Sequence, residues 1–140
     1  MNQTLGALTG FVSWTLLLLV LMEGIRTKLV ATKAVQPNGF TPDNANLSPF
    51  MQRLARAHAN CLEGLPVFGG LMLIALVAGK PAITDPLAYA LLAARIFQSV
   101  VHLWSTAPVA VTLRFSAFAV QMAIGAYWAA RLLAEAGPQS

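Results

Sequence analysis

Charged residues are scarce in this 140-residue chain: they make up 10% of it, whereas a soluble domain carries about a quarter. Together with a hydrophobic share of 57% and a mean hydropathy of +0.66, this scarcity excludes a water-soluble globular domain. Cysteine and histidine are also rare. The single cysteine, Cys61, excludes an intrachain disulfide, and with two histidines it cannot complete a closed zinc site. We therefore expect no bound metal.

The net charge of +4 and the pI near 9.9 are of the kind found in nucleic-acid-binding proteins. However, the nine Lys and Arg residues are dispersed, and the apolar blocks leave no soluble module to carry a basic face. Anionic lipid or an anionic small molecule suits such a chain better. We expect no nucleic-acid partner.

The apolar residues fall into four blocks about 20 residues long, the length that crosses a hydrocarbon layer of about 30 Å. The sequence therefore predicts an all-α integral membrane protein, a four-helix bundle that forms one membrane domain over residues 1–140. The predicted helices cover approximately residues 5–29, 49–78, 86–104 and 108–134, and the one long connection covers approximately residues 30–48.

Prolines mark where the predicted helices begin. Ser48-Pro49 offers an N-cap followed by proline at the first helical position, Asp85-Pro86 repeats this pattern, and Pro108 is a third candidate. The missing N–H of proline costs nothing in a first turn. Pro66, in contrast, lies inside the second predicted helix, where the loss of a backbone hydrogen bond predicts a bend.

The basic residues predict the orientation in the membrane. Residues 1–25 contain no Lys or Arg, and the second connection contains only Lys80. Because cytoplasmic loops carry an excess of basic residues, we expect the first loop to face the cytoplasm in a multi-pass membrane protein, in the inner membrane if the source is bacterial. Five of the nine basic residues flank this loop: Arg26, Lys28, Lys33, Arg53 and Arg56.

Polar side chains inside the predicted spans indicate function, because such groups are costly in a bilayer. We expect an ion pair between Glu63 and Arg95 to join the second and third helices. His102 is interpreted as a packing residue near the interface, since a single histidine lacks the companion ligands that a metal needs. The polar residues within the spans are Glu23, Glu63, Arg95, Gln98, His102, Arg114 and Gln121.

One polar stripe runs along the second predicted helix. Its members fall within an arc of about 80° at 100° per residue, and they are Arg53, Arg56, Asn60 and Glu63, while His58 points elsewhere. The stripe predicts a wall for a polar, partly anionic ligand that enters from the cytoplasm. The alternative is a bundle held together by polar contacts, with basic residues at the lipid headgroups. For Arg53 alone, contact with lipid phosphate is the preferred interpretation.

The stripe belongs to a longer pattern. Residues Arg53–Phe68 contain Arg-Ala-His-x-Asn-x-x-Glu-x-x-Pro-x-Phe, which resembles the second-helix signature of the MAPEG family, membrane-associated proteins in eicosanoid and glutathione metabolism. Ala94–Gln98 is similar to the third-helix element of that family. Leu113-Arg114 lies where the family places an arginine that activates a thiol. The resemblance covers nearly the whole chain.

The resemblance implies a homotrimer that binds glutathione, as co-substrate, between neighbouring subunits near the cytoplasmic side. Arg114 would be the catalytic residue, because a nearby cation favours the reactive thiolate. The implied binding residues are Arg56, Asn60 and Glu63 from one subunit, His58 and Arg26 supplied with Arg114 by its neighbour, and Arg95 and Gln98 in the third-helix element.

The implied activity is that of a membrane-bound glutathione-dependent transferase or peroxidase, whose activated thiol attacks a lipophilic electrophile or a hydroperoxide. Leukotriene-synthase-like members have tyrosines on helices two and three where this chain has Gly64, Ile96 and Val100. A second interpretation therefore stays open. In it the chain is a non-catalytic membrane protein of this fold that binds lipid or a protein partner.

Overall fold

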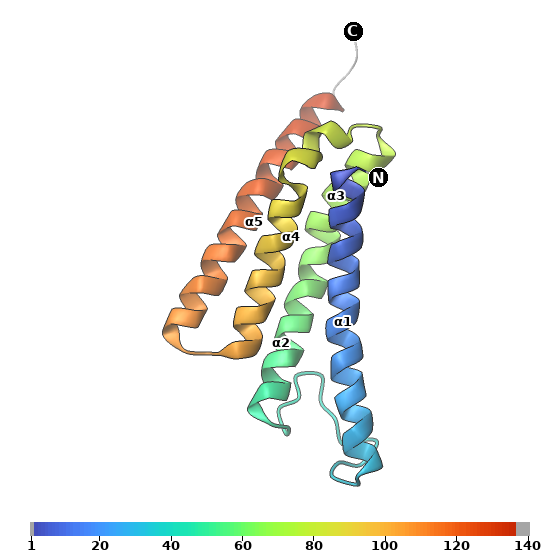
Figure 1. Ribbon diagram of the computed structural model, residues 1–140, viewed down its shortest axis with the longest axis vertical. Coiled ribbons are helices and arrows are strands. Elements are labelled where there is room, and N and C mark those ends of the chain that lie inside the picture. Colours follow the sequence, from blue (N-terminus) through green and yellow to red (C-terminus); the bar gives the residue numbers. More distant parts are fainter. Residues whose placement is uncertain (1, 137–140) are drawn as a thin grey trace.

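The computed structural model describes residues 2–136, which form a bundle of long helices (Figure 1). Within this range α2, the π-helical turn η1 and α3 follow one another without a break, so four rods are long and apolar enough to cross a membrane. The expected all-α fold with four spans is confirmed. The elements are α1 Gln3–Ala31, α2 Pro49–Gly64, η1 Leu65–Gly69, α3 Gly70–Val77, α4 Pro81–Trp104 and α5 Pro108–Glu135.

Two of the three predicted helix starts are confirmed. The Ser48 hydroxyl accepts a hydrogen bond from the backbone N–H of Met51 at 3.3 Å, and Pro49 occupies the first turn of α2. Pro108 opens α5 in the same way. Both prolines lie in the first turn of a helix, where a backbone N–H would have no hydrogen-bond partner within the helix.

The start predicted at Asp85-Pro86 is wrong, because α4 begins at Pro81 and Pro86 lies inside it. Asp85 is engaged elsewhere: its Oδ1 accepts hydrogen bonds from the backbone N–H of Thr4, at 2.8 Å, and from the Thr4 hydroxyl. The Thr4 hydroxyl also lies 2.6 Å from that of Thr84. These contacts hold the first turn of α4 against the start of α1, and tertiary contact of this kind outweighs the local preference of proline.

At Pro66, where the sequence predicts a bend, the rod contains the π-helical turn η1. In a regular α-helix the proline ring collides with the carbonyl group four residues earlier, and the wider π turn is one way to accommodate it. Phe68, within this turn, is buried at 4% exposure. The turn therefore continues the rod while placing an aromatic ring in the bundle.

The first loop is fastened to α1 by Arg26. Its Nη1 donates to Glu23 Oε1 at 2.9 Å, its Nη2 donates to the Thr41 carbonyl at 3.1 Å, and both Nε and Nη2 donate to Asn44 Oδ1. The Asn44 amide in turn donates to the Met51 carbonyl at 2.7 Å. The guanidinium of Arg26 thus joins α1, the loop and α2.

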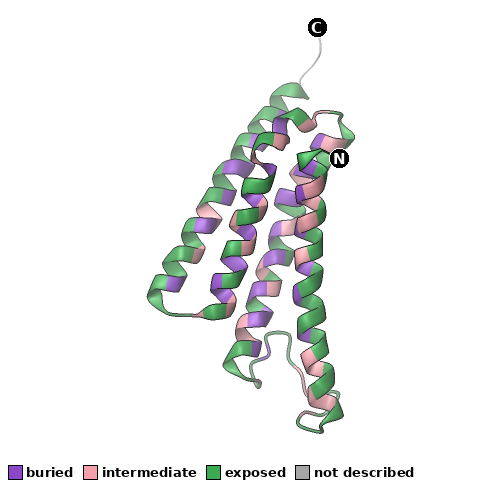
Figure 2. Cartoon of the chain, in the orientation of Figure 1, coloured by how far each residue is buried: buried purple, intermediate pink, exposed green. Residues whose placement is uncertain are grey.

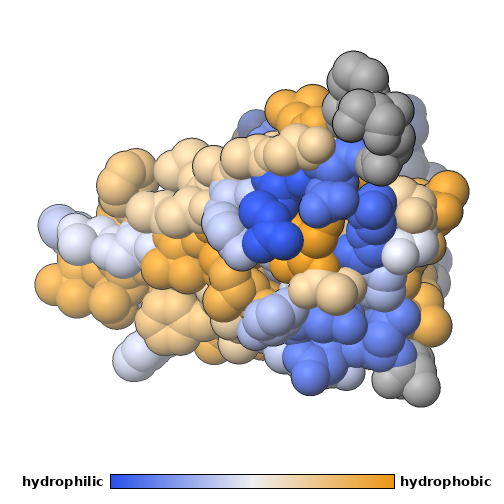
Figure 3. Space-filling model, turned by 90° about the horizontal axis from the view of Figure 1, so that it is seen from above, coloured by the Kyte–Doolittle hydropathy of each residue, from blue (hydrophilic) through white to orange (hydrophobic). Residues whose placement is uncertain are grey.

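Burial follows the pattern expected for a bundle in lipid. Buried residues face one another inside the bundle, while much of the outward surface is exposed (Figure 2). Large apolar side chains on α1, such as Leu16, Leu17 and Val20, are more than half exposed, which is suited to contact with acyl chains. At the end that carries the termini, hydrophilic residues gather (Figure 3), and Lys80 pairs with Glu135 at 3.1 Å.

Candidate functional site

A polar cleft of about 280 Å³ lies where α2, α4 and α5 meet. On α2, positions 56, 60 and 63 follow the four- and three-residue spacing that keeps side chains on one helix face. The structure thus brings together four of the predicted site residues, three from α2 and one from α5. The cleft is lined by Arg56, Ala59, Asn60, Glu63, His102 and Arg114.

The charges in this cleft are not neutralised by one another. Arg56 and Glu63 are exposed, and Arg114 is half-buried. No ion pair to any of these three is present among residues 2–136. Two guanidinium groups and one carboxylate are therefore available to a ligand that enters the cleft.

His102 lines this cleft, although the sequence alone led to its interpretation as a packing residue. It is 3% exposed, and its Nε2 lies 2.7 Å from Nη1 of Arg114. The available signal was its place on α4, seven residues after Arg95 and hence on the same face as that intramembrane cation. A search for metal ligands could not find it, because its partner is an arginine.

Arg53, the outermost member of the stripe, lies apart from the cleft. Its Nε donates a hydrogen bond to the carbonyl oxygen of Leu103 at 2.8 Å. Leu103 belongs to the last turn of α4, where carbonyl groups lack partners within the helix. Arg53 thus closes the end of α4, and lipid phosphate is not needed to explain it.

The predicted ion pair between Glu63 and Arg95 is wrong. Arg95 is fully buried, and its guanidinium lies over the rings of Phe11 and Phe118, at 5.6 and 6.0 Å from their centroids. Among residues 2–136 none of its three nitrogens has a hydrogen-bond partner. The carboxylate of Glu63 instead faces the cleft.

Gly64, the next residue after Glu63, explains why Arg95 does not pair with Glu63. Consecutive residues point about 100° apart on a helix, and it is Gly64 that meets Arg95. A Cβ atom at position 64 would lie 2.6 Å from Nη2 of Arg95. The absence of a side chain therefore makes the space in which the buried guanidinium lies.

Gln98 also lies inside the bundle and does not line the cleft. It is 5% exposed, and its Oε1 accepts a hydrogen bond from Nε2 of Gln121 at 2.8 Å. This contact joins α4 to α5 across the bundle. The two predicted binding residues of the third-helix element, Arg95 and Gln98, are thus placed in the interior of the subunit.

Arg26 and His58 lie on a different side of α2 from the cleft. His58 is two residues from both Arg56 and Asn60, which turns it about 200° away from them. It is half-buried, and the charged groups near it are Glu23 and Arg26. Within one subunit, these two predicted binding residues do not reach the cleft.

Comparison with known proteins identifies the family of this chain. The model of the MAPEG family matches residues 4–134. The chain belongs to the MAPEG family. Comparisons with curated proteins and with solved structures gave no match. Membership identifies a protein of the group associated with membranes and with eicosanoid and glutathione metabolism.

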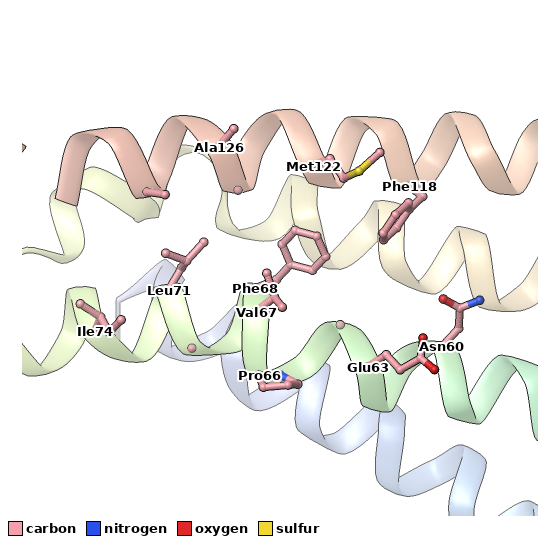
Figure 4. Close-up of a pocket in the computed structure, with 14 residues that line it drawn as sticks. Asn60, Glu63, Pro66, Val67, Phe68, Leu71, Ile74, Phe118, Met122 and Ala126 are labelled. Atoms are coloured by element: carbon pink, nitrogen blue, oxygen red, sulfur yellow. The ribbon is translucent and has the colours of Figure 1, made fainter. Parts of the chain in front are cut away.

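This MAPEG chain has a second, larger pocket of about 680 Å³ beside the polar cleft. It lies between the α2–η1–α3 rod and α5, and Figure 4 shows Phe68, Phe118 and Met122 in it, with Asn60 and Glu63 at one end. Those two polar residues line both hollows. The charged cleft and the apolar pocket are therefore adjacent. The apolar walls are formed mainly by Pro66, Val67, Phe68, Leu71, Ile74, Phe118, Met122 and Ala126.

Proposed function

We propose that this protein is a membrane-bound glutathione-dependent transferase or peroxidase. The observation that carries the proposal is the convergence of Arg56, Asn60, Glu63 and Arg114, from two helices, on one polar cleft. Polar groups within a membrane span are costly and usually mark function. A purely structural bundle would have no need to direct four of them to the same hollow.

The charges of the cleft complement those of glutathione, which carries two carboxylates, one ammonium group and a thiol. Arg56 offers a bidentate partner for a carboxylate, and Glu63 offers an acceptor for the ammonium group. The Asn60 amide adds a donor and an acceptor for the peptide groups. Salt would weaken such binding, since much of it is electrostatic.

Arg114 is the proposed catalytic residue. A free thiol has a pKa near 8.5, so glutathione is mostly protonated at neutral pH, and an adjacent cation favours the thiolate. Lowering the thiol pKa by two units requires about 2.7 kcal/mol. A guanidinium within a half-buried cleft can supply an interaction of this size, and the released proton passes to water.

The apolar pocket beside the cleft would hold the second substrate. With an aryl halide, the thiolate sulfur forms a bond to the ring carbon and the halide leaves. With a hydroperoxide, the sulfur takes the terminal oxygen, the O–O bond breaks and an alcohol leaves. A second glutathione then reduces the sulfenic acid, giving glutathione disulfide and water.

A homotrimer would complete the site. The cleft of about 280 Å³ is smaller than the roughly 300–1,000 Å³ of ligand pockets, so one subunit alone would supply part of a binding site. Arg26 on α1 and His58 on α2 lie away from the cleft of their own subunit, and in the proposed trimer they serve the cleft of a neighbouring subunit. In this arrangement the first loop and the site face the cytoplasm, at the inner membrane if the source is bacterial.

Calorimetry on detergent-purified protein tests the binding step. We expect glutathione to bind, and to bind more weakly as the salt concentration rises. If no binding is measured at millimolar glutathione, the proposed enzymatic function is excluded. That result would favour the alternative, a non-catalytic member of the family that holds lipid in the apolar pocket. Native mass spectrometry tests the homotrimer separately.

Turnover with an activated aryl halide tests the role of Arg114. Arg114→Ala should lower the rate by about a hundredfold, the factor that corresponds to two pKa units, without altering assembly. Arg131→Ala is the matched control, because Arg131 lies on the same helix and contacts Tyr127 there. Equal rates for both variants would show that the activating cation is another residue.

A further inference from the structure

His102 and Arg114 form a contact with defined donor and acceptor roles. Arginine stays protonated and offers only donors, so Nη1 of Arg114 donates to Nε2 of His102 across 2.7 Å. The ring proton of a neutral His102 must then reside on Nδ1. Among residues 2–136, Nδ1 has no hydrogen-bond partner, so the ring nitrogens of His102 make one hydrogen bond in that range, the one with Arg114.

The contact matters because the Arg114 side chain is long and flexible. Its Nε is buried without an acceptor among residues 2–136, and no carboxylate in that range pairs with it. His102, by contrast, is held in the interior at 3% exposure. The more rigid ring therefore fixes the position of the guanidinium in the cleft.

We propose that His102 is a positioning residue, whose neutral imidazole holds Arg114 at the place where the glutathione sulfur would lie. The catalytic consequence rests on the proposed function. The contact itself does not, because it is formed within the ligand-free subunit. His102 contacts neither of the reacting atoms in this account, and it acts through Arg114.

Protonation of His102 would end this arrangement. Both ring nitrogens of an imidazolium are donors, so Nε2 could no longer accept, and two cations would face each other at hydrogen-bond distance. The other charged groups that line the cleft are Arg56 and Glu63 from α2. The contact is thus present above the midpoint of the His102 titration and is lost as the pH falls through it.

Histidine-labelled protein allows a test that needs no activity. The chain has two histidines, so the ¹⁵N signals of His102 are those that vanish in His102→Gln. We expect the Nδ1–H tautomer in the wild type without glutathione. In Arg114→Met the ring should return to the Nε2–H tautomer that free histidine prefers. An Nε2–H tautomer in the wild type would overturn the proposal, whether or not glutathione binds.

Kinetics on two variants separate positioning from simple packing. His102→Leu removes the acceptor and should lower kcat at least about tenfold, as a misplaced catalytic group does, with a smaller change in KM. His102→Gln keeps a neutral acceptor, so it should restore most of kcat and make the acidic limb of the pH profile less steep, leaving the part that protonation of the glutathione thiol itself causes. Equal kcat values and unchanged pH profiles in both variants would overturn the proposal, and an inactive wild type would count against the proposed function alone.

Discussion

Asp85 should contribute strongly to stability although it lies at the end of the bundle away from the cleft. Its Oδ1 accepts hydrogen bonds from the backbone N–H and the hydroxyl of Thr4, a residue with no exposed surface. Thr4 belongs to the first turn of α1, where backbone N–H groups lack partners within the helix. Asp85 therefore caps α1 from another helix.

The magnitude follows from these contacts. A hydrogen bond to a charged group contributes about 1.5–3 kcal/mol, and an anion at a helix N-terminus adds about 0.3–1 kcal/mol. We expect Asp85→Ala to lower the free energy of unfolding by about 2–4 kcal/mol. Asp85→Asn keeps an acceptor oxygen but loses the charge, so it should cost about 1 kcal/mol.

Reversible unfolding in mixed detergent micelles, followed by far-UV circular dichroism, measures these differences. Glu135→Gln is the matched control at the same end of the molecule. It breaks the ion pair between Lys80 and Glu135, whose side chains are 38% and 41% exposed, respectively. Ion pairs exposed to this extent contribute about 0–1 kcal/mol to stability. If Asp85→Ala proves no more destabilising than Glu135→Gln, the carboxylate does not cap α1 and the reasoning is refuted.

Three further substitutions test other parts of the fold. Arg26→Ala should expose residues 32–48 to faster proteolysis, because the loop loses its fastening to α1; an unchanged digestion rate would contradict this. Lys33 has a φ of 62°, so Lys33→Gly should stabilise the protein by about 1 kcal/mol, and a measured loss would argue against it. Gly64→Val should lower the free energy of unfolding by about 1–3 kcal/mol, since its Cβ would lie 2.6 Å from Nη2 of Arg95; Gly70→Val, with open space around it, is the control.

The sequence was sufficient to predict what depends on local chemistry. The four spans follow from long apolar blocks in a chain of low charge, and the starts at Pro49 and Pro108 follow from the tolerance of a first turn for proline. At Pro66 the sequence predicted a bend from the geometry of proline, and it did not predict the π-helical form of the turn found there. The shared face of Arg56, Asn60 and Glu63 needed only the helical repeat.

The predictions that were wrong depended on which neighbouring helix each helix face packs against. Glu63 and Gly64 are adjacent, yet one faces the cleft and the other faces Arg95, a choice that packing makes and periodicity cannot. The start at Pro86 failed because Asp85 contacts Thr4 on a distant helix. His102 was interpreted only as a packing residue for the same reason, since its contact with Arg114 joins two different helices.

The π turn Leu65–Gly69 also has a consequence for how this span tolerates changes of length. A π turn holds one residue more than the α-helical turn that it replaces. Deleting one residue there, Pro66, removes the residue that a regular helix does not accommodate, restores an α-helical turn and leaves Met72 and Ala75, both buried, facing inward. The same deletion elsewhere in Pro49–Val77 rotates all later side chains by about 100° and turns that face toward lipid. We therefore expect the span to tolerate the loss of one residue at this turn better than elsewhere.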